Sequence, residues 1–174
     1  MEVAGSSSRL DILYIGNPLL DISIDDDAEG TILGKYKLEA GQATLASPEQ
    51  MPIYDEIFKM DGRQIFPGGS ALNSARANNY SYKQTDGKEQ VAYMGCIGDD
   101  ERGQALQDSL KSVGVEGRFF IDKETETGSC AVVVKGKERA LCANLAAACK
   151  FPTDHLTSNM VSILKGMDKT QLTI

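Results

Sequence analysis

The sequence predicts an α/β protein in which helices flank a parallel β-sheet and a smaller sheet lies beside it. Short apolar strands alternate with helical stretches along most of the chain, as in parallel sheets covered by helices. Residues 20–24 instead alternate apolar and polar side chains, and residues 128–144 have the pattern of a hairpin. Because such strands keep one wet face, we assign them to a second, smaller sheet.

The first part of the chain supplies several expected elements. An apolar run at residues 10–16 predicts the first core strand, which a Gly-Asn-Pro turn ends. Residues 25–33 are acidic and turn-prone. A Ser-Pro-Glu-Gln capping box predicts a helix over residues 47–58, although Pro52 requires this helix to begin late or to kink.

The remaining elements repeat the order strand, loop and helix. We expect a strand at 64–67, a helix at 71–80, a strand at 90–94, a loop at 95–100, a helix at 101–113, a strand at 117–121, a hairpin at 128–144 and a helix around 156–164. Residues 165–174 contain no clear element.

The composition indicates one soluble, folded domain of 174 residues, of which 41% are hydrophobic and 25% charged. A net charge of −7 leaves no basic surplus for a phosphate backbone or an anionic membrane, so we expect no nucleic-acid and no membrane partner. No apolar run approaches the ~18 residues of a membrane span. The four cysteines form no CxxC pair and His155 is the one histidine, so we predict no metal site and reduced, cytosolic thiols.

The double glycine at Gly68 and Gly69 is the most informative local signal. Two residues without a Cβ allow a ligand to approach the backbone, and the following helix presents free N–H groups from Ser70 onward. Asn73 falls in the first turn of that helix, where its amide can project into the same space. The alternatives are a tight connection between two elements and a solvated amide near a helix start.

Asn17 and Asp21 lie just past the carboxyl end of the first strand, where open α/β sheets bind their ligands. A carboxylate there can accept two hydrogen bonds from a vicinal diol, as acidic residues do when they hold a ribose. The alternative is an Asx turn after Pro18.

Two further segments carry weaker signals. Residues 95–100 are similar to a phosphate loop only superficially, because they lack the GxxxxGKS/T spacing and its lysine. Asp99 or Asp100 is expected as a helix N-cap rather than as a metal ligand. Arg139 can reach a phosphate with its planar fork, although an exposed arginine in a hairpin is commonly a solvated charge.

Taken together, five blocks of sequence resemble the adenosine kinases, which belong to the ribokinase-like (pfkB) family of sugar and nucleoside kinases. The blocks are residues 16–21, 68–74, 95–100, 127–131 and 139–148, and they span the chain from about residue 10 to residue 150. Each block alone is weak evidence, but all five occur in the family's order.

The resemblance implies a ribokinase-like, Rossmann-type parallel sheet with a small β lid. The chain 1–174 would be the N-terminal part of one such domain, incomplete at its C-terminal side, with a discontinuous lid formed by about residues 17–46 and 127–145. The implied reaction is transfer of the γ-phosphate of ATP to the 5′-hydroxyl of adenosine, which gives AMP in purine salvage.

The resemblance also assigns roles to the candidate residues. Asp21 would hold the ribose hydroxyls, with Gly69 and Asn73 beside it and with Gly68 and Ser70 completing the glycine turn. Arg139 would face the phosphates. The residues implied to line the adenosine pocket are Asn17, Leu19, Leu45, Cys130, Leu141 and Ala143.

One departure from the family pattern decides what this chain can do alone. The family's catalytic Asp, its ATP site and its magnesium motif lie in a second half that is absent from this sequence, and from about Met160 the sequence also departs from the pattern. ATP and Mg²⁺ are therefore implied for the full-length family, and neither is expected to bind well to this chain. We expect no turnover by the chain alone, and self-association through an uncovered sheet edge.

Two alternatives stay open. The chain could be a non-catalytic nucleoside-binding or regulatory fragment, or a kinase of the family that acts on another ribonucleoside or on a sugar. The resemblance implies a cytoplasmic location, with the nucleus as an alternative.

Overall fold

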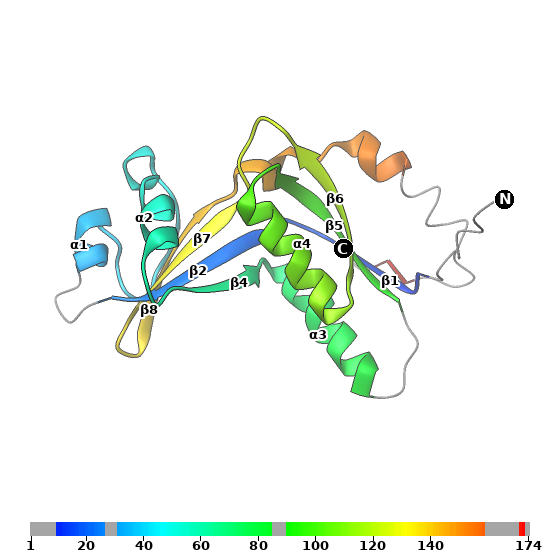
Figure 1. The fold of residues 1–174 in the computed structure, drawn as a ribbon, viewed down its shortest axis with the longest axis horizontal. Coiled ribbons are helices and arrows are strands. Elements are labelled where there is room, and N and C mark those ends of the chain that lie inside the picture. Colours follow the sequence, from blue (N-terminus) through cyan, green and yellow to red (C-terminus); the bar gives the residue numbers. More distant parts are fainter. Residues whose placement is uncertain (1–9, 27–30, 85–89, 159–170, 173–174) are drawn as a thin grey trace.

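The computed structural model describes residues 10–26, 31–84, 90–158 and 171–172. Two β-sheets follow each other along the long axis, and the chain passes from the first sheet into the second between β1 and β2 (Figure 1). The predicted fold class is confirmed, because one sheet is wholly parallel and flanked by helices. The second sheet is mixed as expected, but among the described residues it has five strands against four, so the expectation that it is the smaller sheet is wrong.

The first sheet is parallel throughout. Its strands are, in spatial order, β6 (Glu116–Asp122), β5 (Val91–Gly98), β1 (Ile12–Ile15) and β9 (Gln171–Leu172). All residues of β5 are buried, as expected for a strand covered on both faces.

The second sheet is mixed and has one covered and one open face. Its strands are, in order, β3 (Ala43–Leu45), β8 (Glu138–Asn144), β7 (Ser129–Lys135), β2 (Leu19–Asp25) and β4 (Gln64–Gly68). Strand β2 runs antiparallel to β4 and parallel to β7, and β7 and β8 form the predicted hairpin around Gly136. The sheet therefore also includes β4, which lies outside the segments 17–46 and 127–145.

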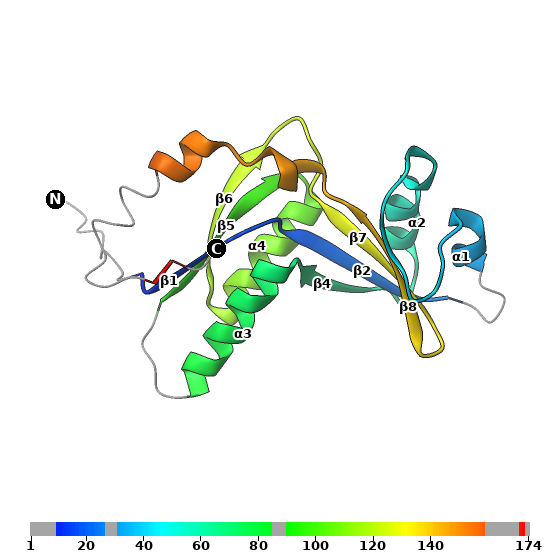
Figure 2. The same cartoon turned by 180° about the vertical axis from the view of Figure 1, so that it is seen from behind.

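The helices divide between the two sheets. They are α1 (Thr31–Tyr36), α2 (Ile53–Lys59), α3 (Ser70–Gln84), α4 (Glu101–Val113) and the 3₁₀ helices Pro48–Gln50 and Ala146–Lys150, and residues 153–158 are also helical. Helices α3 and α4 pack on one face of the first sheet, whereas residues 146–158 run along its opposite face (Figure 2). Helices α1 and α2 lie beside the second sheet.

One large apolar core contains side chains of both sheets and of helices α1 to α4. Strand β2 contributes alternate residues to it. Leu20, Ile22 and Ile24 are at most 3% exposed and pack with side chains of α1 and α2. A smaller cluster, which includes Leu13 and Met94, fills the opposite face of the first sheet. No described helix is long and apolar enough to cross a membrane.

Strand β4 tolerates a proline because it is an edge strand. Pro67 lies opposite Leu20, whose N–H donates to the carbonyl of Gly128 on the other side of β2. The missing N–H of Pro67 therefore faces away from β2 and costs the sheet no hydrogen bond.

Asp100 is the N-cap of α4, which confirms one of the two predicted caps. Its carboxylate accepts hydrogen bonds from Gly103 N at 2.7 Å, Thr127 N at 2.7 Å and Thr127 Oγ1 at 2.6 Å. Burial by itself would raise the pKa of Asp100, but these hydrogen bonds outweigh it and lower the pKa. The helix has the predicted bounds 101–113 and ends at Gly114 in the left-handed region.

A buried arginine ties the two parts of the molecule together. Arg102 of α4 forms an ion pair with Asp55 of α2 at 2.7 Å and a longer one with Glu126 at 3.4 Å. Its guanidinium also lies over the ring of Phe58, 5.8 Å from the ring centroid. Since Asp55 and Phe58 belong to α2, these contacts hold α2 against α4.

Three sequence predictions from the first 100 residues differ in part from the structure or are refined by it. The helix over 47–58 begins late, at Ile53 with Pro52 as its N-cap, which is one of the two predicted outcomes. Residues 95–98 were expected in a loop, but they extend β5, where a Cβ on Gly95 would collide with Gly16 O and with Pro18. The turn-prone segment 25–33 ends inside α1, whose Ile32 and Leu33 are buried.

The last part of the chain also differs from expectation. Residues 171–172 form strand β9 and pair with Ile12 and Leu13, although no element was expected there. The helix expected around 156–164 is observed over 153–158, and the rest of that prediction lies outside the described residues.

Candidate functional site

The open face of the second sheet gathers most of the candidate residues, because they lie at matching register positions on neighbouring strands. Residues in register on adjacent strands point to the same face. One row across the sheet consists of Leu45, Ala143, Cys130, Asp21 and Phe66, on β3, β8, β7, β2 and β4 respectively. Cys130 and Phe66 thus flank Asp21 on the two adjacent strands, and Ala143 lies one strand beyond Cys130.

The next positions along β8 extend this face. Leu141 lies two residues before Ala143 and in register with Ala43 and Val132. Arg139 lies a further two residues away on the same face and is exposed. Four residues of strand span about 13 Å, so Arg139 lies one small molecule's length from the row that contains Asp21.

Asp21 has an unusual environment for a carboxylate. Burial is the main cause that raises the pKa of Asp21 to about 6, while the positive charge of Arg139 opposes the shift. The carboxylate lies directly over Gly68, so closely that a Cβ at that position would overlap its oxygens. Glycine is therefore required beside Asp21 for steric reasons.

Gly69 brings the double-glycine turn against the segment that follows β1. Its φ is +96°, a value that favours glycine, and a Cβ there would collide with the backbone carbonyl of Asn17. Leu19 N lies 3.7 Å from the same position. The structure thus places Gly68 against Asp21, and Gly69 against Asn17 and Leu19.

The start of α3 is tied to the same turn. Ser70 is the first residue of α3 and is exposed, and Asn73 N donates to Gly69 O at 2.9 Å. The side-chain oxygen of Asn73 accepts a hydrogen bond from Arg76 Nη1 at 3.2 Å, and the same nitrogen lies 3.4 Å from Pro67 O. Arg76 therefore links the Asn73 amide to β4, the strand that ends at Gly68.

Cys130 lies in the middle of the row and is 7% exposed. Burial, with a contribution from the charge of Asp21, raises the pKa of Cys130 to about 12, so that its thiol is neutral at pH 7. A neutral thiol behaves as a small apolar group, which suits the side of a flat, uncharged ligand. The other three cysteines are also free thiols.

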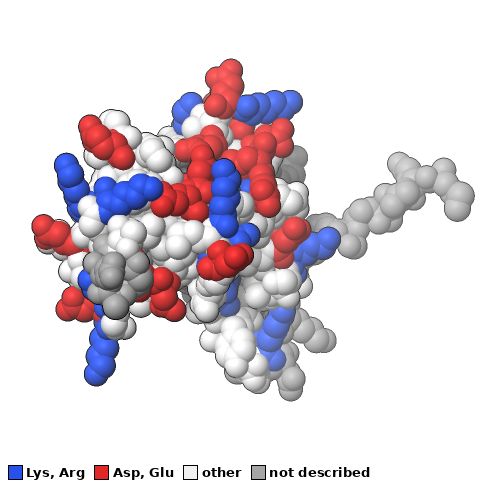
Figure 3. Space-filling model, turned by 60° about the vertical axis from the view of Figure 1, so that its left-hand side comes forward, with Lys and Arg blue, Asp and Glu red and all other residues white. Residues whose placement is uncertain are grey.

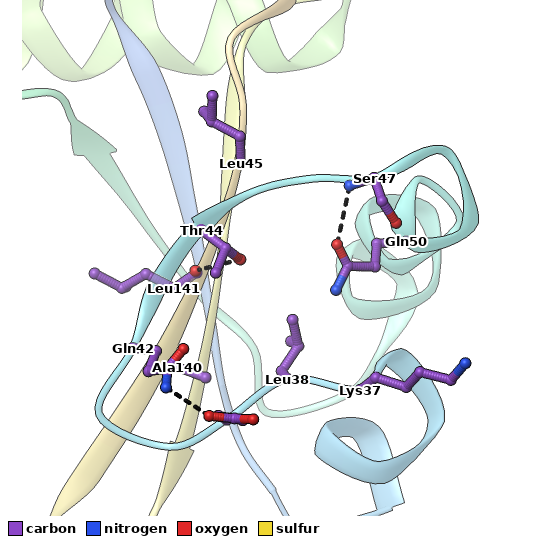
Figure 4. Close-up of a pocket in the computed structure, with 10 residues that line it drawn as sticks. Lys37, Leu38, Gln42, Thr44, Leu45, Ser47, Gln50, Ala140 and Leu141 are labelled. Carbon is purple, nitrogen blue, oxygen red and sulfur yellow. Dashed lines mark hydrogen bonds between the residues drawn. The ribbon is translucent and has the colours of Figure 1, made fainter.

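A hollow of about 300 Å³ adjoins the row at its β3 end (Figure 4). It includes Leu45 and Leu141 but otherwise consists of residues that the sequence did not single out: Lys37, Leu38, Glu39, Gln42, Thr44, Ser47, Gln50 and Ala140. Thr44 Oγ1 lies 3.5 Å from Leu141 O, and Ser47 N donates to Gln50 Oε1 at 2.9 Å. The hollow does not include Asp21 or the glycines.

The described residues offer no cradle for a divalent cation. Within 10–26, 31–84, 90–158 and 171–172, no three His, Cys, Asp or Glu side chains lie close enough to hold a metal ion. On the face drawn in Figure 3, acidic side chains gather near the centre and basic ones are scattered among them.

Sequence reasoning missed Phe66 and Arg76. Phe66 completes the row beside Asp21, and its partner across the sheet depends on the pairing of β2 with β4, which the local sequence does not reveal. Arg76 could have been found, because it lies three residues after Asn73 and therefore on the same side of α3.

A parallel sheet flanked by helices and joined to a mixed sheet is the architecture of a ribokinase-like protein. The chain belongs to the pfkB family of carbohydrate kinases, whose family pattern matches residues 43–168. Within that family, its relatives include adenosine kinases.

The adenosine kinase of Dictyostelium discoideum is 39% identical over 158 residues, which are 90% of this chain and 45% of the relative. The structure of Trypanosoma brucei brucei adenosine kinase superposes with a TM-score of 0.80 at 37% identity, and the match covers 91% of this chain and 46% of that one. Schistosoma mansoni adenosine kinase in complex with adenosine gives a TM-score of 0.76 at 28% identity, covering 92% and 46%. The chain therefore spans about half the length of these relatives.

Proposed function

We propose that this chain is the nucleoside-binding part of an adenosine kinase, an enzyme that transfers the γ-phosphate of ATP to the 5′-hydroxyl of adenosine to give AMP. The observation that carries the proposal is the proximity of Asp21, the double glycine and Asn17 beside the apolar residues and the thiol of the same row. The adenosine kinases among the relatives support the choice of substrate. In this role the protein would serve purine salvage in the cytoplasm, with the nucleus as the alternative location.

The chemistry of the face matches the parts of a nucleoside. The Asp21 carboxylate can accept a hydrogen bond from each of two neighbouring ribose hydroxyls, and the glycines let the sugar approach the backbone. Leu45, Leu141 and the neutral Cys130 thiol supply the apolar surface that a flat base requires. In this proposal the second sheet acts as the lid, with residues 17–46 and 127–145 as its main segments.

Phosphoryl transfer also requires a group that accepts the hydroxyl proton and groups that stabilise the charge on the phosphate. We propose that these groups, with the ATP and Mg²⁺ sites, belong to the portion of the relatives that this chain does not span. Arg139 is our candidate among the described residues for a phosphate contact. The chain alone should therefore bind adenosine without converting it.

Calorimetry with adenosine and a coupled assay for AMP test this proposal together. Adenosine binding without AMP formation is the expected result, and AMP formation by the purified chain would contradict the predicted inactivity. Binding of ribose with no preference for adenosine would favour a sugar kinase. A chain that binds neither ligand would overturn the assignment of the site.

We also propose that the first sheet associates through the outer edge of β1. Strand β9 pairs with β1 at Ile12 and Leu13, while β1 continues to Ile15. An edge that is paired over part of its length can accept a further strand. Sedimentation velocity across a range of concentrations should show a dimer or larger species, and a single monomer species at all concentrations would contradict this proposal.

A further inference from the structure

Two large apolar side chains lie exposed at the two ends of the row that contains Asp21. Leu45 on β3 is 68% exposed and Phe66 on β4 is 47% exposed, and neither belongs to the two apolar clusters of the described residues. Strands β3 and β4 are the two edges of the second sheet. Leu45 and Phe66 thus occupy equivalent positions at opposite ends of one row.

The two ends differ in what lies next to the apolar side chain. Phe66 is directly opposite Asp21, whereas Leu45 is in register with Ala143 and separated from Asp21 by two strands. Directly opposite residues on antiparallel strands have Cβ atoms about 5 Å apart, so the side chains of Phe66 and Asp21 leave the sheet from neighbouring positions on the same face. The carboxylate of Asp21 also lies directly over Gly68, which has no side chain.

We propose that Phe66 is the specificity-determining residue that makes this site select ribonucleosides over 2′-deoxyribonucleosides. Its ring covers the β4 side of Asp21 and, with a nucleoside bound, keeps water from the carboxylate oxygens. This inference rests on the proposed function, because it takes the Asp21 carboxylate as the acceptor of the two ribose hydroxyls.

Discrimination follows from what happens to the carboxylate when one hydroxyl is absent. A 2′-deoxyribose leaves one acceptor position of Asp21 without a donor, and a shielded, unpaired acceptor is costly. If the ring of Phe66 is removed, water can occupy the position of the missing hydroxyl and satisfy the carboxylate. The penalty for the deoxy ligand then falls, while the affinity for adenosine falls less.

The experiment compares the dissociation constants of adenosine and 2′-deoxyadenosine for the full 174-residue chain by calorimetry. We expect wild type to prefer adenosine by about 30-fold and Phe66→Ala to prefer it by less than about fivefold. Leu45→Ala is the matched control, because it removes a similar apolar side chain from the opposite end of the same row. It should weaken the binding of both nucleosides by the same factor and leave the preference unchanged.

Two further variants protect the test against a loss of folding. Phe66→Leu keeps a large apolar side chain and should keep the preference, whereas Phe66→Thr suits an edge strand and should lose it. Circular dichroism melting shows which variants fold. An unchanged preference in folded Phe66→Ala or Phe66→Thr would overturn the role of Phe66 while leaving the proposed function intact. Failure of wild type to bind adenosine would instead overturn the proposed function, and this inference with it.

Discussion

The two faces of the second sheet are built from alternate residues of the same strands, yet one face packs against helices and the other is open. On β2, Ile22 is fully buried under α1 and α2, whereas its neighbour Asp21 lies on the open face with a carboxylate whose pKa burial has raised to about 6. The covered face holds the sheet to the helices. The open face places a partly desolvated charge beside exposed apolar residues, an arrangement that contributes little to stability and suits a ligand.

The comparison predicts that the largest change in stability comes from the covered face. Ile22→Ala should lower the free energy of unfolding by about 3 kcal/mol, because it leaves a cavity in a core that cannot fully collapse. Urea denaturation followed by circular dichroism measures this loss. A loss below about 1 kcal/mol would show that this face of the sheet is loosely packed.

On the open face, a polar substitution should act on binding rather than on folding. Asp21→Asn keeps the shape of the side chain but replaces one acceptor oxygen by a donor, so adenosine affinity should fall about 100-fold, or ~2.7 kcal/mol. At pH 7 the variant should also melt at a higher temperature than wild type, because the half-buried charge is gone. Equal adenosine affinity in the variant and wild type would remove Asp21 from the site.

The raised pKa of Asp21 predicts opposite effects of pH on binding and on stability. Adenosine affinity should fall about tenfold between pH 8 and pH 5, as the carboxylate gains a proton around pH 6. Over the same range the Cys130 thiol stays neutral, so it does not mask the effect.

The effect on folding has the other sign. Because the folded state holds this proton more tightly than the unfolded state, the contribution of Asp21 to stability is greatest below about pH 4 and is lost as the pH rises through about 6. Melting temperatures of wild type and Asp21→Asn, measured from pH 4 to pH 8, isolate this contribution. Parallel curves for the two proteins would contradict it.

The smallest effect is expected at the exposed edge of the row. Leu45→Ala should change the free energy of unfolding by less than about 0.5 kcal/mol, since the side chain is 68% exposed. Chemical denaturation of this variant beside Ile22→Ala gives the direct comparison of the two faces. A loss similar to that of Ile22→Ala would show that the open face is covered by contacts from outside the described residues.

Local patterns in the sequence identified the elements whose causes are themselves local. The alternation in β2, the Asp100 cap and Gly114 end of α4, and the hairpin at Gly136 all follow from residues within a few positions of each other. The extension of β5 through Gly95 and Gly98 could not be predicted in this way, because it depends on close contacts with segments elsewhere in the chain.

The candidate site also contains residues that local sequence identifies and residues that only long-range contacts identify. Asp21, the double glycine and Asn17 stand out in the sequence as residue types suited to a sugar, and the structure brings them into contact. The position of Phe66 beside Asp21 depends on how β2 and β4 pair, and register between strands more than forty residues apart is not visible in either strand alone. Phe66 could therefore be recognised as part of the candidate site only from the pairing of the strands and not from its residue type.

Pro67 has a consequence for the edge of the second sheet at β4. A foreign strand that docked there would need the outward N–H groups of β4, and the proline removes one of them. Pro67, which directly precedes the double glycine, therefore disfavours the addition of further strands at this edge. Strand-by-strand polymerisation of the second sheet would have to begin at β3, the short strand at its opposite edge.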